Sequence, residues 1–599
     1  MWGRFKLEIK FIKILGLLSL AAGIFLVLSC FSSAGILPDR LMEATRGFRL
    51  FAICIGILAI AFGALSLIFP SRINRLFERI SGLDGRFQTK YFYLVFCFAC
   101  FVIAFMFGLL ITQSGSGISP DSAYYIKTGE NIFSGQGFYQ IEGKPYTDWP
   151  PLYPLSIAAF MHLGIDAEQA ARLVPILCFA LLIFPAFFLG KILGNVFTGY
   201  FTCLIFLVFA PLLYITSYAL AEMPYVLFCV LAILFLAKFV ISNEPGVKNL
   251  GVAGLFTALA ILTRWPGFAL LPAGLIAIIF KNKSRLKNTA YQSVLFGAIS
   301  MIPIVLWIYR NFTLAGTLTG DRGQSIMGLL AGINATIVTI FRDFFFRLLS
   351  QELYSDFYAY TGLAIIVACF ILLAVLVKIS SPGRKVVLEY LRKNYIVILY
   401  AAGYVVTIII SMLLWSHDPI DTRILVPAYP FLILASISFI FFAYREIKNP
   451  AIKPTLFRVI IIFCLLFLVL QAGGALSYYQ FAKHGQGYNN PSWRNEQGIG
   501  WAANNVPANT MVYSDVAEGV GFLIKRPVSF LPRSGNEIAI DEFFVKLRNE
   551  EQSFIICFKE FYHRPYLLSN GELIEANWKY GVLVIIADFP TSTIWRVNH

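Results

Sequence analysis

The sequence has little charge and few acidic residues. Asp, Glu, Lys and Arg together make up 14% of its 599 residues, and only 33 residues are Asp or Glu. A soluble chain of average composition carries about 25% charged residues. Hydrophobic residues reach 58% and the mean hydropathy is +0.73. This balance excludes an ordinary soluble protein and predicts a mainly α, polytopic membrane protein.

The sequence also lacks the cysteine pattern of a disulfide framework or a zinc site. Ten cysteines are present, and almost all lie inside apolar runs. Cys97 and Cys100 form a C-x-x-C pair, but no second pair or histidine accompanies it. In a lipid environment, cysteine behaves as a small hydrophobic residue, so these positions predict packing.

Long apolar runs are what the sequence has in abundance. At roughly 20 residues per crossing, they predict about thirteen transmembrane helices. The runs lie near 14–36, 50–70, 91–113, 168–192, 196–217, 222–241, 249–264, 266–281, 290–309, 361–378, 395–415, 423–443 and 457–478. The two short runs on either side of Trp265-Pro266 also fit a re-entrant hairpin, which would leave every other loop on its assigned side.

The net charge of +15 is carried by short loops between the apolar runs. The basic loops are 71–90, 281–287, 378–393 and 445–458. This is the distribution of an orientation signal, so the loops and the N-terminus are predicted to be cytoplasmic and nucleic acid is not an expected partner. Outward-facing segments are then 114–167, 310–360, 415–422 and the C-terminal tail.

The first large outward loop, from Ser119 to Tyr153, gathers acids among aromatics. Ser119 followed by Pro120 is typical of a helix N-terminus, which puts Asp121 in the first turn of a helix running to about Phe133. Pro150-Pro151 opens a second segment through Met161. Polar residues are retained between spans when something polar binds there. Asp121 is therefore the leading catalytic candidate; Tyr124, Lys144 and Asp148 are candidates for substrate binding.

Three further candidates lie at the outward ends of apolar runs. Glu222 opens one span in SYALAEMPY, Arg264 lies in LTRWPGF and Arg423 lies in DPIDTRILVPAYP. A guanidinium binds phosphate bidentately, which suits a phosphate-bearing substrate. Glu222 is also explained by the helix dipole, and the two arginines by interfacial anchoring.

A cofactor is not firmly indicated. His417, Asp418 and Asp421 stand beside Arg423 and are residue types that bind divalent cations, so a metal is left open there.

After Tyr479 the composition changes to that of a small α/β domain, expected outside the membrane over residues 480–599. Helices are predicted at Trp493–Asn505 and Glu537–Asn549. Short strands are predicted at Thr510–Tyr513, Ser553–Phe558 and Gly581–Ala587. Its expected use is to cover the membrane cavity or to help recognise the acceptor. The remaining units are 1–90, with two helices and a basic loop, and a membrane core over 91–479.

The order PDSAYY, a glycine-rich turn, and DWPPLYPL before an apolar helix resembles the GT-C superfamily of polyprenyl-phosphate-sugar-dependent glycosyltransferases. Within it the chain is most similar to the branch of bacterial proteins related to protein O-mannosyltransferases and the lipid A aminoarabinose transferase. The resemblance implies that Asp121 serves the transfer and that an acid at Glu222 belongs to the site. Ser122 stands where the family often has a second acid, so a role that needs an acidic pair is in doubt.

The expected reaction is an inverting transfer of a sugar from a polyprenyl-phosphate donor to a hydroxyl of a lipid, glycan or protein, at the outer face of a bacterial-type inner membrane. Asp121 would accept the proton, Glu222 would orient a substrate, and Arg264 or Arg423 would hold the phosphate. A lipid-linked glycan transporter or flippase is the alternative, although such proteins place ionisable residues near mid-membrane. A glycan polymerase or ligase would be favoured by a large late external loop.

Overall fold

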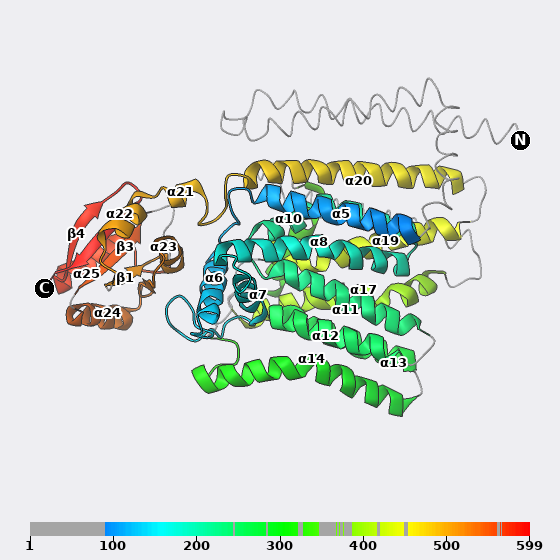
Figure 1. The fold of residues 1–599 in the computed structure, drawn as a ribbon, viewed down its shortest axis with the longest axis horizontal. Helices are drawn as coiled ribbons and strands as arrows, with labels where there is room; N and C mark the ends of the chain where they lie inside the picture. The colour runs from blue at the N-terminus through cyan, green and yellow to red at the C-terminus, as the bar shows by residue number, and fades with distance from the viewer. Residues whose placement is uncertain are drawn as a thin grey trace, which may run out of the picture.

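The computed structural model describes residues 90–598 apart from 243–245, 283–284, 321–327, 347–385 (of which 367, 371 and 375 are described), 416–419, 448–452, 509, 551, 560–563 and 565. Within these residues, a layer of long, roughly parallel helices forms one body and a small sheet with helices lies at one of its ends (Figure 1). The expected unit 1–90 lies outside the described residues, except for Lys90.

Helices lie over all ten predicted runs in the described part of the chain, although α12 is shorter than a candidate membrane span. They and their short extensions are α5 (Lys90–Ile111), α8 (Ala167–Leu193), α9 (Val196–Val208), α10 (Ala210–Ser217), α11 (Glu222–Ile241), α12 (Val247–Thr263), η2 (Trp265–Ala269), α13 (Leu270–Asn282), α14 (Leu286–Ala315), α17 (Val386–Leu414), α18 (Thr422–Leu425), η5 (Val426–Ala428), α19 (Tyr429–Glu446) and α20 (Lys453–Ala482). The predicted runs 14–36, 50–70 and 361–378 fall on residues that are not described, apart from three isolated positions in the last.

Eight helices in the described part are long and apolar enough to cross a membrane, and α9 with α10 makes a ninth if that bent pair is one span. The protein is therefore a multi-pass membrane protein, while the total of about thirteen stays a prediction.

The α9–α10 pair bends by 54°. Phe209 is extended there and Pro211 follows it in the first turn of α10. Proline has no N–H for the helix ladder, which explains a break at this point.

The centre of the bundle is formed by α8 and α11, which are the most buried of the long helices together with α19. α11 packs against α8 on one side and α12 on the other. In lipid, such packing depends on close van der Waals contact rather than on hydrophobic transfer from water. The N-terminal end of α11, where Glu222 lies, is thus surrounded by protein.

Shorter elements cover the end of the bundle that faces the sheet. They are α6 (Pro120–Phe133), α7 (Leu152–Met161), α15 (Leu329–Phe341) and the π-helical turn η3 (Arg342–Phe346). α6 and α7 begin where Ser119-Pro120 and Pro150-Pro151 predict them, and the two helices pack against each other.

A five-stranded sheet follows α20, with strand order β2-β1-β3-β5-β4. Its elements are α21 (Pro491–Arg494), α22 (Gln497–Asn505), β1 (Met511–Ser514), α23 (Ala517–Ile524), β2 (Ser529–Phe530), α24 (Glu537–Asn549), β3 (Ser553–Phe558), α25 (Asn570–Tyr580), β4 (Leu583–Asp588) and β5 (Ser592–Val597). β1 runs parallel to β2 and β3, and β5 is antiparallel to β3 and β4. All six residues of β3 are buried, as in a central strand covered on both faces.

Residues 117 and 118 tie three distant segments together beside α6. The Gly117 N–H donates to the Ser217 carbonyl (2.8 Å), and the Tyr488 N–H donates to the Ile118 carbonyl (2.8 Å). Gly487 has a φ of +58°, and a Cβ there would lie 2.0 Å from the Ile118 oxygen, so only glycine fits. These bonds place the start of α6, the approach to α11 and the start of the C-terminal segment side by side.

Candidate functional site

Asp121 is placed by the N-terminus of α6 without being needed to cap it. The Ser119 side chain accepts a hydrogen bond from the Ser122 N–H, and the Ser122 hydroxyl accepts one from the Ser119 N–H, which completes a capping box. Pro120 occupies the first turn. Since the cap is already supplied by serines, the Asp121 carboxylate is left to interact beyond its own helix.

Three other charged residues reach the same place from three different elements. Glu222 is the first residue of α11, Arg264 is the extended residue that ends α12, and Arg423 lies in the short helix α18. Asp421 caps α18 by accepting from the Ile424 N–H at 3.1 Å.

These four residues form one network of ion pairs, which we call the charge cluster. Arg423 donates through Nη2 to Asp121 Oδ2 and through Nε to Glu222 Oε1. Arg264 donates through Nη1 to the same Glu222 oxygen. Two carboxylates and two guanidiniums therefore balance each other, from segments up to 302 residues apart in the chain.

The charge cluster is largely buried, and Glu222 lies deepest. The Glu222 side chain is 2% exposed, whereas the side chain of Asp121 is 23% exposed. An ionised carboxylate at such depth is costly unless it is paired, so the two guanidiniums are what keep Glu222 charged. Its second oxygen, Oε2, is buried and has no hydrogen-bond partner among the described residues.

Aromatic side chains form one wall beside Asp121. Tyr125 packs edge-on against Trp149 (ring centroids 5.8 Å apart) and against Tyr153 (5.1 Å). Burial, reinforced by the neighbouring Asp121 carboxylate, raises the pKa of the Tyr125 phenol well above its ordinary range. Tyr125 is therefore a neutral group at physiological pH.

The remaining predicted binding residues lie in the loop but outside the charge cluster. Tyr124 donates to Glu142 Oε1 (2.9 Å), and Lys144 pairs with Glu142 Oε2 (3.4 Å) while its side chain is 75% exposed. Asp148 Oδ2 accepts from Gln140 (2.6 Å), and the Asp148 carbonyl accepts from the Trp265 indole N–H (2.9 Å). Trp265 follows Arg264 directly, so this bond holds the loop next to one arginine.

A metal site does not emerge from the described residues, in which no group of three His, Cys, Asp or Glu side chains is placed to hold an ion. His417 and Asp418 lie outside that part of the chain. Asp421, the third residue of the sequence motif, caps α18.

Two buried acids near the charge cluster were not among the sequence candidates. Asp343 in η3 contacts Thr422, the neighbour of Arg423, and Glu518 in α23 pairs with Arg564. Asp343 had a readable signal, because it is the one acid in the mostly apolar stretch 337–349. Glu518 had none, since an acid in the first turn of a helix is common.

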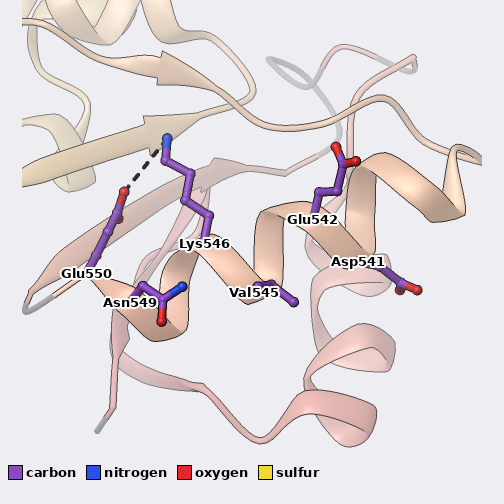
Figure 2. A pocket seen from close by; sticks show the side chains of 6 residues that line it. All are labelled: Asp541, Glu542, Val545, Lys546, Asn549 and Glu550. Carbon is purple, nitrogen blue, oxygen red and sulfur yellow. Dashed lines mark ion pairs between the residues drawn. The ribbon is translucent and has the colours of Figure 1, made fainter.

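A hollow of about 570 Å³ lies elsewhere, along the surface of α24 (Figure 2). Its side chains are Asp541, Glu542, Val545, Lys546, Asn549 and Glu550. Lys546 pairs with Glu550 there at 3.7 Å. None of the residues of the charge cluster or of the loop lines this hollow, and we assign it no role.

Comparison with known proteins agrees with this architecture. Residues 148–307 match the family model described as dolichyl-phosphate-mannose-protein mannosyltransferase. The crystal structure of ArnT from Cupriavidus metallidurans bound to undecaprenyl phosphate has a TM-score of 0.55 at 13% identity, over 85% of this chain and 98% of that one. The apo form of the same protein also has a TM-score of 0.55 at 13% identity, over 84% and 97%. The archaeal oligosaccharyltransferase AglB from Archaeoglobus fulgidus is more distant, with a TM-score of 0.45 at 15% identity over 78% and 70%.

Curated proteins give no match to the sequence. The matched segment and the ArnT fold nevertheless confirm the family resemblance predicted from the sequence: the chain has the fold of the GT-C glycosyltransferases. Within that class it is similar to the branch that contains the mannosyltransferase family and ArnT.

Proposed function

We propose that the protein is a membrane glycosyltransferase that moves a sugar from a polyprenyl-phosphate donor to an acceptor hydroxyl at the outer face of the membrane. The observation that carries the proposal is the charge cluster, in which Asp121 shares Arg423 with the buried Glu222, and Glu222 also pairs with Arg264. A structure with the same fold binds undecaprenyl phosphate. The match to a mannosyltransferase family over 148–307 supports a glycosyl-transfer reaction.

The arginines suit the phosphate of such a donor. Arg423 already uses two of its donor groups on carboxylates, and Arg264 uses one. A donor phosphate at this position would compete with Asp121 for the Nη2 group of Arg423. Glu222 would keep its ion pairs with both guanidiniums. Binding of the donor would thus release the Asp121 carboxylate for chemistry.

The chemistry is a single displacement. The acceptor oxygen forms a bond to the anomeric carbon as the bond from that carbon to the phosphate oxygen breaks. The bonding electrons go to the polyprenyl phosphate, whose charge Arg264 and Arg423 stabilise. The acceptor proton passes to Asp121, which acts as general base. Attack opposite the leaving group inverts the anomeric configuration.

The position of the charge cluster favours this function over transport. The four residues lie at one end of the bundle, next to α6 and the C-terminal segment, whereas transporters place their ionisable residues near the middle of the membrane. Residues 480–599 are assigned to an external unit that covers the cluster and helps to recognise the acceptor, which is a lipid, a glycan or a protein. The membrane is a bacterial-type inner membrane.

The test is to incubate the purified protein with a panel of polyprenyl-phosphate sugars and candidate acceptors and to measure release of polyprenyl phosphate. The proposal expects release from at least one donor, with a product of inverted anomeric configuration. Absence of release from every donor, with protein that is folded and binds polyprenyl phosphate weakly or not at all, would overturn it.

A further inference from the structure

Arg423 lies in the first turn of a longer helical run. α18 spans four residues, from Thr422 to Leu425, and continues through η5 into α19, so that Thr422–Glu446 is one candidate span. The direction of the Arg423 side chain depends on how this first turn is held. Two contacts at this turn are the bond from the Tyr404 hydroxyl of α17 to the Ile424 carbonyl (2.7 Å) and the Asp421 cap.

A third contact comes from η3, and it is made by a buried acid. Asp343 Oδ1 accepts from the Thr422 hydroxyl at 2.8 Å, and Asp343 Oδ2 accepts from the Tyr429 hydroxyl at 2.7 Å. The Asp343 side chain is 0% exposed. Arg342 accompanies it, with Nε 3.6 Å from Oδ1 and with Nη2 donating to the Thr422 hydroxyl at 3.0 Å. The carboxylate therefore joins the first residue of α18 to the first residue of α19, and Arg423 lies between these two points.

The local backbone explains how an acid arrives there. The helix α15 ends at Phe341 and continues as a π-helical turn, RDFFF, in which the wider spacing turns side chains away from their α-helical directions. Such turns are frequent at functional sites. In this turn Phe344 packs against Tyr429 (ring centroids 5.2 Å apart), while Asp343 contacts Thr422.

We propose that Asp343 is a positioning residue for the transfer, which acts by fixing Thr422 and, through it, the direction of the Arg423 guanidinium. This inference rests on the proposed role of Arg423 toward the donor phosphate. It gives the external segment 329–346 a function in donor binding. Arg423 serves two acids through two different nitrogens, so a small rotation of α18 breaks one of its bonds and misplaces the fork.

The first test compares Asp343→Ala and Thr422→Val with Thr336→Val as the matched control. Thr422→Val keeps the shape of the side chain and removes only the hydroxyl that reaches Asp343. Thr336 is a buried threonine of α15 whose hydroxyl bonds Gly332 in its own helix, so its loss spares α18. Misplacement of a catalytic contact by about 1 Å costs up to roughly a hundredfold. We expect a KM for the polyprenyl-phosphate sugar that is raised about tenfold or more in the two test variants, with the acceptor KM unchanged.

The second test separates positioning from a general loss of structure. If Asp343 acts through Arg423, then Asp343→Ala in an Arg423→Lys background should add little to the loss already caused by the lysine. The proposal would be overturned if the loss in the double variant equalled the product of the losses in the two single variants. It would also be overturned if Thr422→Val had the same donor KM as Thr336→Val. Failure of the proposed function shows itself differently, because the wild-type protein would then release no polyprenyl phosphate at all.

Discussion

At the residue scale, Glu222 is the side chain on which the charge cluster depends. It is buried, and one of its oxygens serves both Arg264 and Arg423. From the sequence, the dipole of α11 is an alternative explanation of Glu222, because Glu222 is the first helical residue. The structure adds the two guanidiniums, which a helix-end role does not require. Its depth means that Glu222 is placed to organise the arginines, while the more exposed Asp121 is the acid that a substrate can reach.

The two arginines differ in what they hold, and this gives a graded prediction. Arg423 bonds two acids through Nε and Nη2, a geometry that a single ammonium cannot reproduce, whereas Arg264 bonds one acid through Nη1. Arg423→Lys should therefore raise the donor KM about tenfold, whereas Arg264→Lys should raise it only about a few-fold. Steady-state kinetics with varied donor measures this. Equal, wild-type behaviour of both lysine variants would reduce the arginines to interfacial anchors.

The four residues of the charge cluster could be selected as candidates from the sequence, but their contact in the folded protein could not be predicted. Asp121 follows the helix-start signal Ser119-Pro120, and Glu222, Arg264 and Arg423 each stand at the end of an apolar run, so both patterns are local. Arg423 is separated from Asp121 by 302 positions and from Glu222 by 201. The backbone pairing of residue 117 with the segment at 217–219 brings the start of α6 next to the start of α11, and this pairing has no sequence signature.

At the scale of elements, the sequence predicts the bounds of helices and strands well where the local pattern is strong, and poorly where it is weak. α24 and β3 have the predicted bounds, and α6 ends at Phe133 as expected from Ser119-Pro120. The predicted helix Trp493–Asn505 is instead two helices, because Glu496 is extended and caps α22 by accepting from the Ile499 N–H at 2.6 Å. The strand β2 has two residues, which is too short for any periodic pattern. The predicted extent of the C-terminal unit, 480–599, stays a prediction.

The contact between α23 and α6 yields a prediction at this scale, with a built-in control. Glu518 of α23 is 1% exposed in its side chain and pairs with Arg564, which is 23% exposed; the Tyr488 hydroxyl donates to the same Glu518 oxygen at 3.2 Å. Arg564→Ala leaves a buried carboxylate without its cation and should destabilise the protein by about 3 kcal/mol. Lys525→Ala removes an ion pair with Glu168 whose lysine is 60% exposed, and should cost under about 1 kcal/mol.

Thermal unfolding in detergent, with hydrogen exchange of α23 as a local readout, compares the two variants. Similar melting temperatures for Arg564→Ala and Lys525→Ala would mean that the buried pair does not hold α23 on α6.

At the scale of the whole molecule, the two ends of the bundle differ in charge. The α13–α14 connection lies at the end opposite the sheet, and the basic residues Lys281 and Lys393 bond backbone carbonyls near the ends of α11 and α8 there (Figure 1). The charge cluster and the sheet lie at the other end. This arrangement is consistent with the basic loops being cytoplasmic, which is the orientation that the positive-inside rule predicts.

Reporter fusions test that orientation. After Asn282, a reporter that works only in the cytoplasm should be active. After Asn598, a reporter that works only outside the cytoplasm should be active, because the two points lie at opposite ends of the bundle. The same compartment for both would contradict the topology and would place Asp121 on the wrong side for a lipid-carried donor.

The most direct test of the whole account is the transfer rate of Asp121→Asn against that of the wild type, measured beside thermal stability. Ser119 and Ser122 cap α6, so the amide should leave the helix in place. Asparagine cannot accept the acceptor proton, and loss of a general base costs about a hundredfold or more. We predict a folded protein with transfer reduced at least about a hundredfold. A folded Asp121→Asn protein that transfers sugar at nearly the wild-type rate would contradict the mechanism.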